Sequence, residues 1–240
     1  MWCSAPSPSG ADQTMKCLLV SACLTVLAGC HGPGERHAPG PMAWIPHPAT
    51  VIAMYGDSTT QGNGAPRHQS EPAWLQTMVP PDVLVINEGV SGTTATQLLE
   101  GTDGVHPPFD QVVAKSPAQI VTLQFGLNDT VRSTPDQFFD SLSALVDIAA
   151  AAGKRVVLQE PNASCLANRV KLPAYVAAMR KVANEKALPL VRQYEAYPEW
   201  REHLPDCLHP DGAYYRIKAQ NTFNTINALL PGARPGQNAH

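Results

Sequence analysis

The sequence predicts an α/β fold, a three-layer α/β/α sandwich with a central, mostly parallel five-stranded sheet. Strand-like and helix-like segments alternate along the chain, and nearly all of the strand-like segments are continuous apolar runs. Continuous apolar strands are typical of parallel sheets that helices cover on both faces. The crossovers between successive strands are therefore expected to be right-handed. No internal repeat is visible, and one domain is expected.

The first strand is expected to begin at Val51 and to end at Gly56-Asp57-Ser58, where small and polar residues interrupt the apolar run. Further strands are predicted at residues 82–87, 120–125, 155–159 and 188–191, and helices at 71–79, 93–99, 135–152, 172–187 and 211–229. Segments 61–70 and 101–108 are turn-rich or loop-like. Helix 135–152 is the clearest, because its apolar residues form one stripe and Gly153 provides a C-terminal stop.

Residues 1–29 comprise an upstream segment, 1–14, that fits no signal pattern, and a segment from Met15 that has the features of an export signal. Met15-Lys16 precedes a stretch of apolar and small residues at 17–28, too short to span a bilayer, and we expect translation to start at Met15. The junction at residues 27–30, Leu-Ala-Gly-Cys, resembles a bacterial lipobox, whose cysteine is acylated. We therefore expect a lipid anchor on Cys30 and a location in the bacterial cell envelope. An ordinary secretory signal is the alternative.

Two further segments flank the predicted domain. Residues 30–49 are rich in Gly, Pro and His, which favours a flexible tether, and residues 231–240 are expected to form a disordered tail. Residues 50–230 remain as a single domain, long enough to bury a sizeable core and expected to be monomeric.

Charge and cysteine content narrow the function classes. The net charge is −3, from 17 basic and 20 acidic residues, and no basic run or interleaved aromatic patch suggests binding to nucleic acid. Only Cys165 and Cys207 of the six cysteines lie in the predicted domain. An oxidising compartment favours a disulfide, and two separate buried thiols are the alternative. Neither cysteine lies in a metal-binding pattern, so no metal and no cofactor are expected.

Three predicted strand ends carry residues suited to chemistry: Ser58, Gly89 and Asn128. The Gly-Asp-Ser segment alone is equally explained as a helix cap. A nucleophilic serine also needs a general base and an acid that orients this base. Asp206 and His209 provide this pair, and prolines on both sides favour a fixed loop. In such a loop the carboxylate can reach Nδ1 while Nε2 faces Ser58.

The other seven histidines are less suitable as the base. His31, His37 and His47 lie in the predicted tether, and His240 lies in the predicted tail. The remaining three, His68, His106 and His203, are expected to lack a comparable acid and turn.

Taken together, these motifs resemble the SGNH/GDSL hydrolase superfamily of esterases and lipases. The matching segments are Gly56-Asp57-Ser58, Gly89, Gly126-x-Asn128-Asp129 and Asp206-x-x-His209-Pro210, and they occur in the family's order. They cover nearly the whole predicted domain. The resemblance implies the flavodoxin-like fold of this superfamily, in agreement with the alternation of strands and helices.

The resemblance also implies a role for each matching residue. Ser58 would be the nucleophile, His209 the general acid and base, and Asp206 the residue that orients His209. The oxyanion hole would combine the backbone N–H groups of Ser58 and Gly89 with the side-chain amide of Asn128. Such preset donors stabilise the charge that develops in a tetrahedral intermediate.

Two aspartates and two cysteines complete the predicted site. Asp57 and Asp129 are expected to accept hydrogen bonds that fix loops. The family commonly has glycine after the aspartate of its last motif, whereas this chain has Cys207. Because Cys165 follows the fourth strand, we expect the two cysteines to form a disulfide that clamps the loop of Asp206 and His209.

The expected activity is that of a serine esterase without metal or cofactor, working through an acyl-enzyme intermediate. The loops around the site are short and polar or rich in Pro and Gly, and no long apolar lid is evident. We therefore expect a small-molecule ester substrate with a short acyl group, such as an acetylated carbohydrate. A lysophospholipase or acyl-thioesterase is one alternative, and a binding protein that keeps the fold without turnover is another.

Overall fold

The computed structural model describes residues 48–230, and it contains the predicted five-stranded sheet. The strands are β1 (Thr50–Gly56), β2 (Val83–Gly89), β3 (Ile120–Gln124), β4 (Arg155–Gln159) and β5 (Leu190–Val191). They are arranged in the order β2-β1-β3-β4-β5, and every neighbouring pair is parallel. The prediction of a parallel α/β sheet is therefore confirmed.

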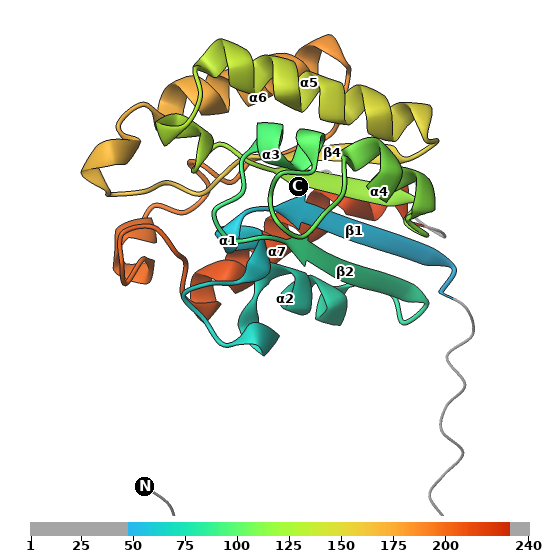
Figure 1. The fold of residues 1–240 in the computed structure, drawn as a ribbon. Coiled ribbons are helices and arrows are strands. Elements are labelled where there is room, and N and C mark those ends of the chain that lie inside the picture. Colours follow the sequence, from blue (N-terminus) through green and yellow to red (C-terminus); the bar gives the residue numbers. More distant parts are fainter. Residues whose placement is uncertain (1–47, 231–240) are drawn as a thin grey trace, which may run out of the picture. The chain divides into compact units, whose positions relative to one another are not determined.

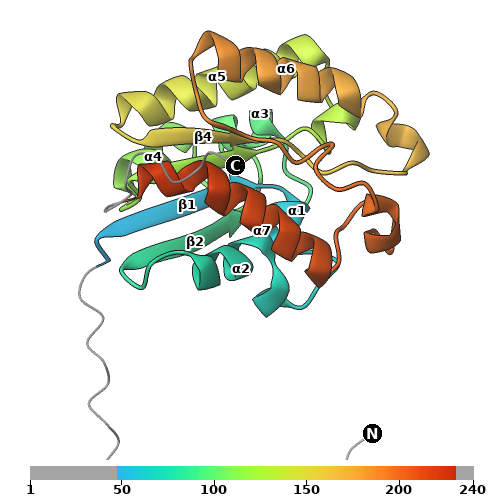
Figure 2. The same ribbon diagram turned by 180° about the vertical axis from the view of Figure 1, so that it is seen from behind.

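Residues 48–230 contain seven α-helices, six of which cover the two faces of this sheet. They are α1 (Ser58–Gln61), α2 (Glu71–Met78), α3 (Ala95–Glu100), α4 (Phe109–Lys115), α5 (Pro135–Ala151), α6 (Leu172–Glu185) and α7 (Gly212–Ile226). Figure 1 shows α3, α4, α5 and α6 on one face, and α2 and α7 on the other. The view from behind in Figure 2 shows α7 running across the sheet on the same side as α2. The three-layer α/β/α sandwich is thus confirmed.

Alternate residues of β1 point into two separate hydrophobic cores. Val51, Ala53 and Tyr55 belong to the core beneath α3, α4, α5 and α6. Ile52 and Met54 belong to the core beneath α2 and α7. Because both faces of β1 are buried, its sequence is a continuous apolar run and not an alternating one.

The strand order places the end of β1 at the point where the chain changes direction across the sheet. β1 pairs with β2 on one side and with β3 on the other, and the register sets Gly56 beside both Gly89 and Gln124. Ligands of open α/β sheets bind outside the carboxyl ends of the strands at such a switch point. The residues that follow β1 are therefore in the position where this fold binds its ligand.

Several element boundaries differ from the sequence-based prediction. Helix α4 was not predicted, because its seven residues are too few to show a clear period. The last strand is limited to Leu190–Val191. Helix α3 begins at Ala95 because Thr94 forms a capping box with Gln97.

Some predictions lie outside the described residues. These are the export signal at residues 1–29, lipidation of Cys30, most of the tether at 30–49 and the tail at 231–240. Within residues 48–230, no helix is both long and apolar enough to cross a membrane.

Candidate active site

Ser58 lies at the carboxyl end of β1, where the strand turns directly into α1. Asp57 caps this short helix, because its Oδ1 accepts hydrogen bonds from the N–H and the hydroxyl of Thr59, each at 2.8 Å. Gly56 is required at the turn, since a Cβ there would lie 2.7 Å from the backbone oxygen of Gln124. The helix-cap interpretation is therefore correct for Asp57, and it leaves the Ser58 hydroxyl free for another role.

The loop that precedes α7 brings His209 and Asp206 to Ser58. His209 Nε2 lies 2.9 Å from Ser58 Oγ, and His209 Nδ1 lies 2.6 Å from Asp206 Oδ2. An ionised carboxylate can only accept hydrogen bonds, so Nδ1 carries the proton and Nε2 accepts from the Ser58 hydroxyl. The structure thus brings these three residues together in the order that the sequence predicts.

The turn at Asp206 keeps its carboxylate ionised. Asp206 Oδ1 accepts hydrogen bonds from the backbone N–H groups of Leu208, at 3.0 Å, and His209, at 2.7 Å. Desolvation acts to raise the pKa of Asp206, but these hydrogen bonds and the one from the His209 ring outweigh it. The pKa therefore lies below its ordinary value, as a residue that orients a histidine requires.

A second turn of the same kind corrects the prediction about His106. Asp103 Oδ1 accepts hydrogen bonds from the N–H groups of Val105, at 2.9 Å, and His106, at 2.7 Å, and Asp103 Oδ2 lies 2.7 Å from His106 Nδ1. His106 therefore has the acid and the turn that the sequence analysis denied it. Its Nε2, however, faces Glu88 Oε2 at 3.4 Å and has no serine beside it. The two histidines thus lie in the same kind of turn and differ in the residue that faces Nε2, which is Ser58 for His209 and Glu88 for His106.

His203 also has an acidic partner that the sequence analysis did not foresee. Its Nδ1 lies 2.8 Å from Asp211 Oδ2, and Asp211 also caps α7 by accepting from the Tyr214 N–H. This pair fixes the start of α7.

Cys165 and Cys207 form the expected disulfide, with a Cα–Cα distance of 4.8 Å. The Cys207 carbonyl also accepts hydrogen bonds from the Cys165 N–H, at 3.0 Å, and from the Ser164 hydroxyl, at 2.7 Å. Cys207 has a φ of +64°, in the left-handed region where glycine is favoured. This backbone conformation explains why the family that the sequence resembles commonly has glycine here. A residue with a side chain adopts it at a cost of about 1–2 kcal/mol.

Two of the three predicted oxyanion donors are available. Within residues 48–230, the Ser58 N–H takes part in no hydrogen bond. The Asn128 side-chain amide donates one hydrogen to the Thr93 carbonyl at 3.1 Å, which leaves the second free. Gly89 is different, because its N–H already donates to Asn87 Oδ1 at 3.0 Å. The prediction for Gly89 is therefore wrong.

Gly92 offers the backbone donor that Gly89 does not. It lies in a turn closed by the hydrogen bond from the Thr93 N–H to the Val90 carbonyl, and its φ of +81° requires glycine. Its own N–H has no partner among the described residues. The turn is held beside the end of β1, since the Val90 N–H donates to the Gly56 carbonyl at 2.9 Å. The sequence signal was the second glycine of Gly89-Val90-Ser91-Gly92.

Asp129 fixes the loops around Asn128, as expected. Its carboxylate accepts from the N–H groups of Ala95, at 3.0 Å, and Gly126, at 2.9 Å. Burial raises its pKa to about 6, although these two hydrogen bonds oppose the shift. Burial also raises the pKa of Asp57, with the Thr59 hydrogen bonds and Lys218 opposing it.

A buried lysine on α7, which the sequence analysis missed, connects the two halves of the site. Lys218 and Glu71 of α2 are both fully buried, and their charged atoms lie 3.2 Å apart. Lys218 Nζ also donates to Gln124 Oε1 at 2.9 Å, and Gln124 in turn donates to the Thr59 hydroxyl beside Ser58.

The same ammonium group reaches the histidine loop. Lys218 Nζ lies 3.5 Å from Asn162 Oδ1, and the Asn162 amide donates to the carbonyl of Leu208 at 3.0 Å. Leu208 directly precedes His209 in the chain. One buried cation therefore links the turn that carries Ser58 with the loop that carries His209.

A mostly polar cavity of about 540 Å³ is lined by residues of α1, of the loop that follows it and of the end of β2. Gln61, Asn63, Arg67 and Asn87 contribute polar side chains to its lining. None of Ser58, Asp206 and His209 lines this cavity, but the Asn63 N–H donates to the Ser58 carbonyl at 3.0 Å, so the lining loop directly follows the turn that carries Ser58.

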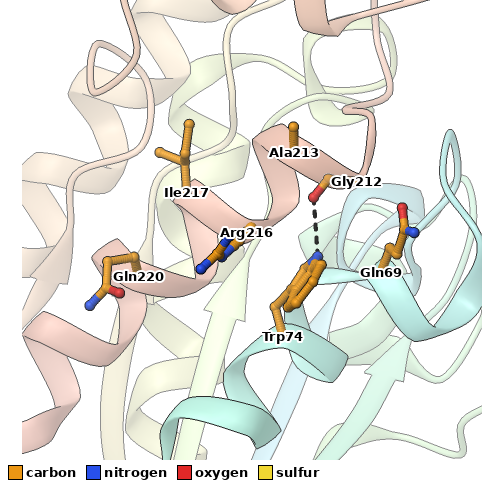
Figure 3. A pocket seen from close by; sticks show the side chains of 7 residues that line it. All are labelled: Gln69, Trp74, Gly212, Ala213, Arg216, Ile217 and Gln220. Carbon is orange, nitrogen blue, oxygen red and sulfur yellow. Dashed lines mark hydrogen bonds between the residues drawn. The ribbon is translucent and has the colours of Figure 1, made fainter.

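A second cavity, of about 510 Å³, lies between α2 and α7 (Figure 3). The Trp74 indole at its edge donates to the Gly212 carbonyl at 3.1 Å, and the Arg216 guanidinium lies 5.6 Å from the ring centre. The indole is therefore engaged by the protein's own groups. None of Ser58, Asp206 and His209 lines this cavity. Within residues 48–230, no group of three or more His, Cys, Asp or Glu side chains is arranged to hold a metal ion.

Solved structures share this fold. TesA is 22% identical, with a TM-score of 0.63 over 75% of this chain and 100% of that chain. The acetylxylan esterase Axe2 from Geobacillus stearothermophilus is 20% identical, with a TM-score of 0.60 over 78% of this chain and 98% of that chain. A carbohydrate acetylesterase family member from Sinorhizobium meliloti is 18% identical, with a TM-score of 0.60 over 75% of this chain and 99% of that chain.

At such identities the likeness shows a common fold and nothing about substrate. A comparison with curated proteins returns no match. The model of the GDSL-like lipase/acylhydrolase family, in contrast, matches residues 54–217, which is more than half of the chain and extends from β1 to α7. The chain therefore belongs to the GDSL-like lipase/acylhydrolase family and is a carboxylic ester hydrolase.

Proposed function

We propose that the protein cleaves carboxylic esters with Ser58 as the nucleophile, His209 as the general base and acid, and Asp206 as the residue that orients His209. The observation that carries this proposal is the continuous path from Ser58 Oγ to His209 Nε2, at 2.9 Å, and from His209 Nδ1 to Asp206, at 2.6 Å. These distances allow direct proton transfer from a serine to its base.

In the first half of the reaction, His209 Nε2 takes the proton of the Ser58 hydroxyl as Oγ attacks the ester carbonyl carbon. The negative charge moves to the carbonyl oxygen, where the N–H groups of Ser58 and Gly92 and the Asn128 amide stabilise it. The C–O bond to the alcohol then breaks, and His209 gives its proton to the departing alcohol. An acyl group remains on Ser58.

In the second half, a water molecule attacks the acyl carbon while His209 Nε2 takes a proton from it. The oxyanion forms again in the same place, the bond to Ser58 Oγ breaks, and His209 returns the proton to Ser58. Asp206 stabilises the charged imidazole in both halves. The products are the free carboxylic acid and the regenerated enzyme.

The favoured substrate is an ester of a short acyl group, such as acetyl, with a hydrophilic alcohol such as a carbohydrate. The mostly polar cavity at the end of α1 supports this choice, because amide side chains such as Asn63 and Asn87 are suited to hydroxyl groups. Two proteins of similar fold, an acetylxylan esterase at 20% identity and a carbohydrate acetylesterase family member at 18% identity, are in line with this choice.

The test is burst kinetics with p-nitrophenyl acetate, together with labelling of Ser58 by a fluorophosphonate probe. Wild type is expected to show a burst and to become labelled, whereas Ser58→Ala is expected to do neither. Asn128→Ala is expected to lower kcat on the order of 10²–10³-fold, the effect of losing one oxyanion donor. Undiminished turnover in Ser58→Ala would disprove the assignment, and a wild type that is neither labelled nor active would favour a ligand-binding protein.

A panel of acetylated sugars, long-chain lysophospholipids and acyl-thioesters then separates the substrate classes. We expect kcat/KM to be greatest for the acetylated sugars. A rise in kcat/KM with acyl-chain length would favour a lysophospholipase or acyl-thioesterase.

We also propose that the protein is exported and anchored to a membrane of the bacterial envelope by acylation of Cys30. The lipobox-like sequence at residues 27–30 supports this proposal. Metabolic labelling with a palmitate analogue is expected to modify the wild type and not Cys30→Ser. Equal labelling of both would contradict it.

A further inference from the structure

Arg169 is a buried cation without a partner. The residue is only 9% exposed, and its Nε and Nη1 atoms are buried without a hydrogen bond. These two nitrogens form no hydrogen bond with any residue in the range 48–230. An arginine that is buried in a protein is normally paired.

Arg169 lies beside the candidate active site. It ends the short 3-10 helix Ala167–Arg169, which packs against the 3-10 helix Asp129–Val131, directly after Asn128. Burial lowers the pKa of the guanidinium, while nearby Asp57 raises it and nearby Arg132 lowers it further. Asp57 and Arg132 both belong to the surroundings of Ser58, because Asp57 caps α1 and Arg132 donates to the Gly92 carbonyl at 2.6 Å.

In the described part of the chain, none of the charged groups near Arg169 forms a hydrogen bond or ion pair with its guanidinium. Asp57 is close enough to affect it, but no hydrogen bond or ion pair joins the two, and Asp57 Oδ2 is itself buried without a partner. Asp129 directs its carboxylate to backbone N–H groups. Arg132 adds a second positive charge close enough to lower the pKa of Arg169. Arg169 is therefore a largely buried guanidinium, two of whose nitrogens, Nε and Nη1, have no hydrogen-bond partner.

We propose that Arg169 binds a carboxylate group of the substrate, so that the enzyme prefers anionic esters over neutral ones. This inference rests on the proposed function, since it assigns a recognition role beside Ser58. A guanidinium is suited to a carboxylate because it provides several N–H donors in one plane. A bound carboxylate would offset the desolvation of Arg169, which no group of the protein does.

The carboxylate can belong to either part of the ester. On the acyl side, the substrate would be a half-ester of a dicarboxylic acid. On the alcohol side, it would be an acylated sugar acid. The two sources share the same chemistry at Arg169, and matched substrate pairs distinguish them.

The experiment compares kcat/KM within two pairs of esters that differ only in a carboxylate. The first pair is monoethyl succinate and ethyl butyrate, and the second is the 2-O-acetyl esters of methyl galacturonoside and methyl galactoside. Wild type is expected to prefer the anionic member of one pair, which identifies the source. Arg169→Gln is expected to lower kcat/KM for that member about 10- to 100-fold and to change the neutral member less than about twofold.

Arg155→Gln serves as the control, because Arg155 is the first residue of β4 and so lies at the amino ends of the parallel strands, whereas Ser58 follows the carboxyl end of β1. It is expected to leave both members of each pair unchanged. Arg169→Gln is expected to melt at the same temperature as wild type or higher, because it removes an uncompensated buried charge. Arg169→Met provides a second neutral replacement if Gln does not fold.

Two results would overturn the inference. One is the absence of any preference for the anionic ester in both pairs. The other is an equal loss on anionic and neutral esters in the Arg169 variants, which would indicate a structural role. Neither result affects the assignment of Ser58, because hydrolysis of p-nitrophenyl acetate tests that assignment separately.

Discussion

Removing the disulfide between Cys165 and Cys207 is expected to reduce the free energy of unfolding by about 4 kcal/mol. The two cysteines are 42 residues apart in the sequence. In the chain-entropy treatment, a closed loop of this length restricts the unfolded chain by about that amount. For a domain of this size, the melting temperature should fall by about 8–16 °C.

The backbone of Cys207 makes the choice of replacement informative. Its φ of +64° penalises any residue with a Cβ, whereas glycine adopts this conformation freely. Glycine gains about 1–2 kcal/mol from this difference and loses about 0.5–1 kcal/mol to the greater freedom of its unfolded chain. Cys165→Ala/Cys207→Gly is therefore expected to be more stable than Cys165→Ala/Cys207→Ala by up to about 1.5 kcal/mol.

Urea denaturation of wild type and both double variants measures these two effects separately. The difference between wild type and the alanine variant reports the disulfide, and the difference between the two variants reports the backbone at position 207. If the glycine variant were no more stable than the alanine variant, the argument from the left-handed conformation would fail. If both variants matched wild type, the entropic argument for the disulfide would fail as well.

Two further predictions concern charged side chains, namely the buried pair of Lys218 and Glu71 and the half-buried His106. Lys218→Met/Glu71→Gln removes both charges of the buried pair, so the fold should persist. Because Ser58 and His209 lose their common support, kcat should fall on the order of 10- to 100-fold while KM stays unchanged. Leu145→Ala, in the opposite core, is the control for destabilisation alone, and an equal loss of kcat in this variant would contradict the expectation. For His106, the hydrogen bond to Glu88 outweighs desolvation and, together with Asp103, raises the pKa. Protonated His106 therefore stabilises the fold below about pH 6.5, and this contribution is lost as the pH rises through the pKa of the folded state. The stability lost in His106→Gln should therefore be greater at about pH 5.5 than at about pH 8.5, and equal losses at both values would refute the expected charge of His106.

The strands and their ends could be predicted because buried parallel strands leave a strong pattern in the sequence. The apolar run of β1 and the break at Gly56-Asp57-Ser58 placed Ser58 at the edge of the sheet. Asp206 and His209 could be paired with it because prolines and a three-residue spacing indicate a turn.

The sequence-based predictions were wrong where the role of a residue depends on whether its hydrogen-bonding groups already have a partner. Gly89 and Gly92 both follow β2, and only the three-dimensional structure shows that the Gly89 N–H is used by Asn87. His106 lies in the same kind of turn as His209, but the sequence cannot show that Glu88 faces its Nε2. In both cases the local pattern was correct and the long-range partner decided the role.

The burial of Lys218 and Arg169 could not be predicted from the sequence, for a related reason. Lys218 and Arg169 look like surface residues in the sequence, since isolated basic side chains are usually exposed. Their burial results from the packing of α7 and of the loop after β4 against distant segments. No local signal could have identified them.

The contacts of Lys218 also indicate which segments can change between related enzymes so that the substrate preference changes and the catalytic residues stay in place. The ammonium group ties the Ser58 turn and the His209 loop to one helix, so a change in any of these elements must remain compatible with the others. Residues 61–67 and 167–170 form no hydrogen bond with Lys218, although they carry most of the lining of the polar cavity and Arg169. Substitutions there can alter the ester that is bound while the proton-transfer path is inherited unchanged.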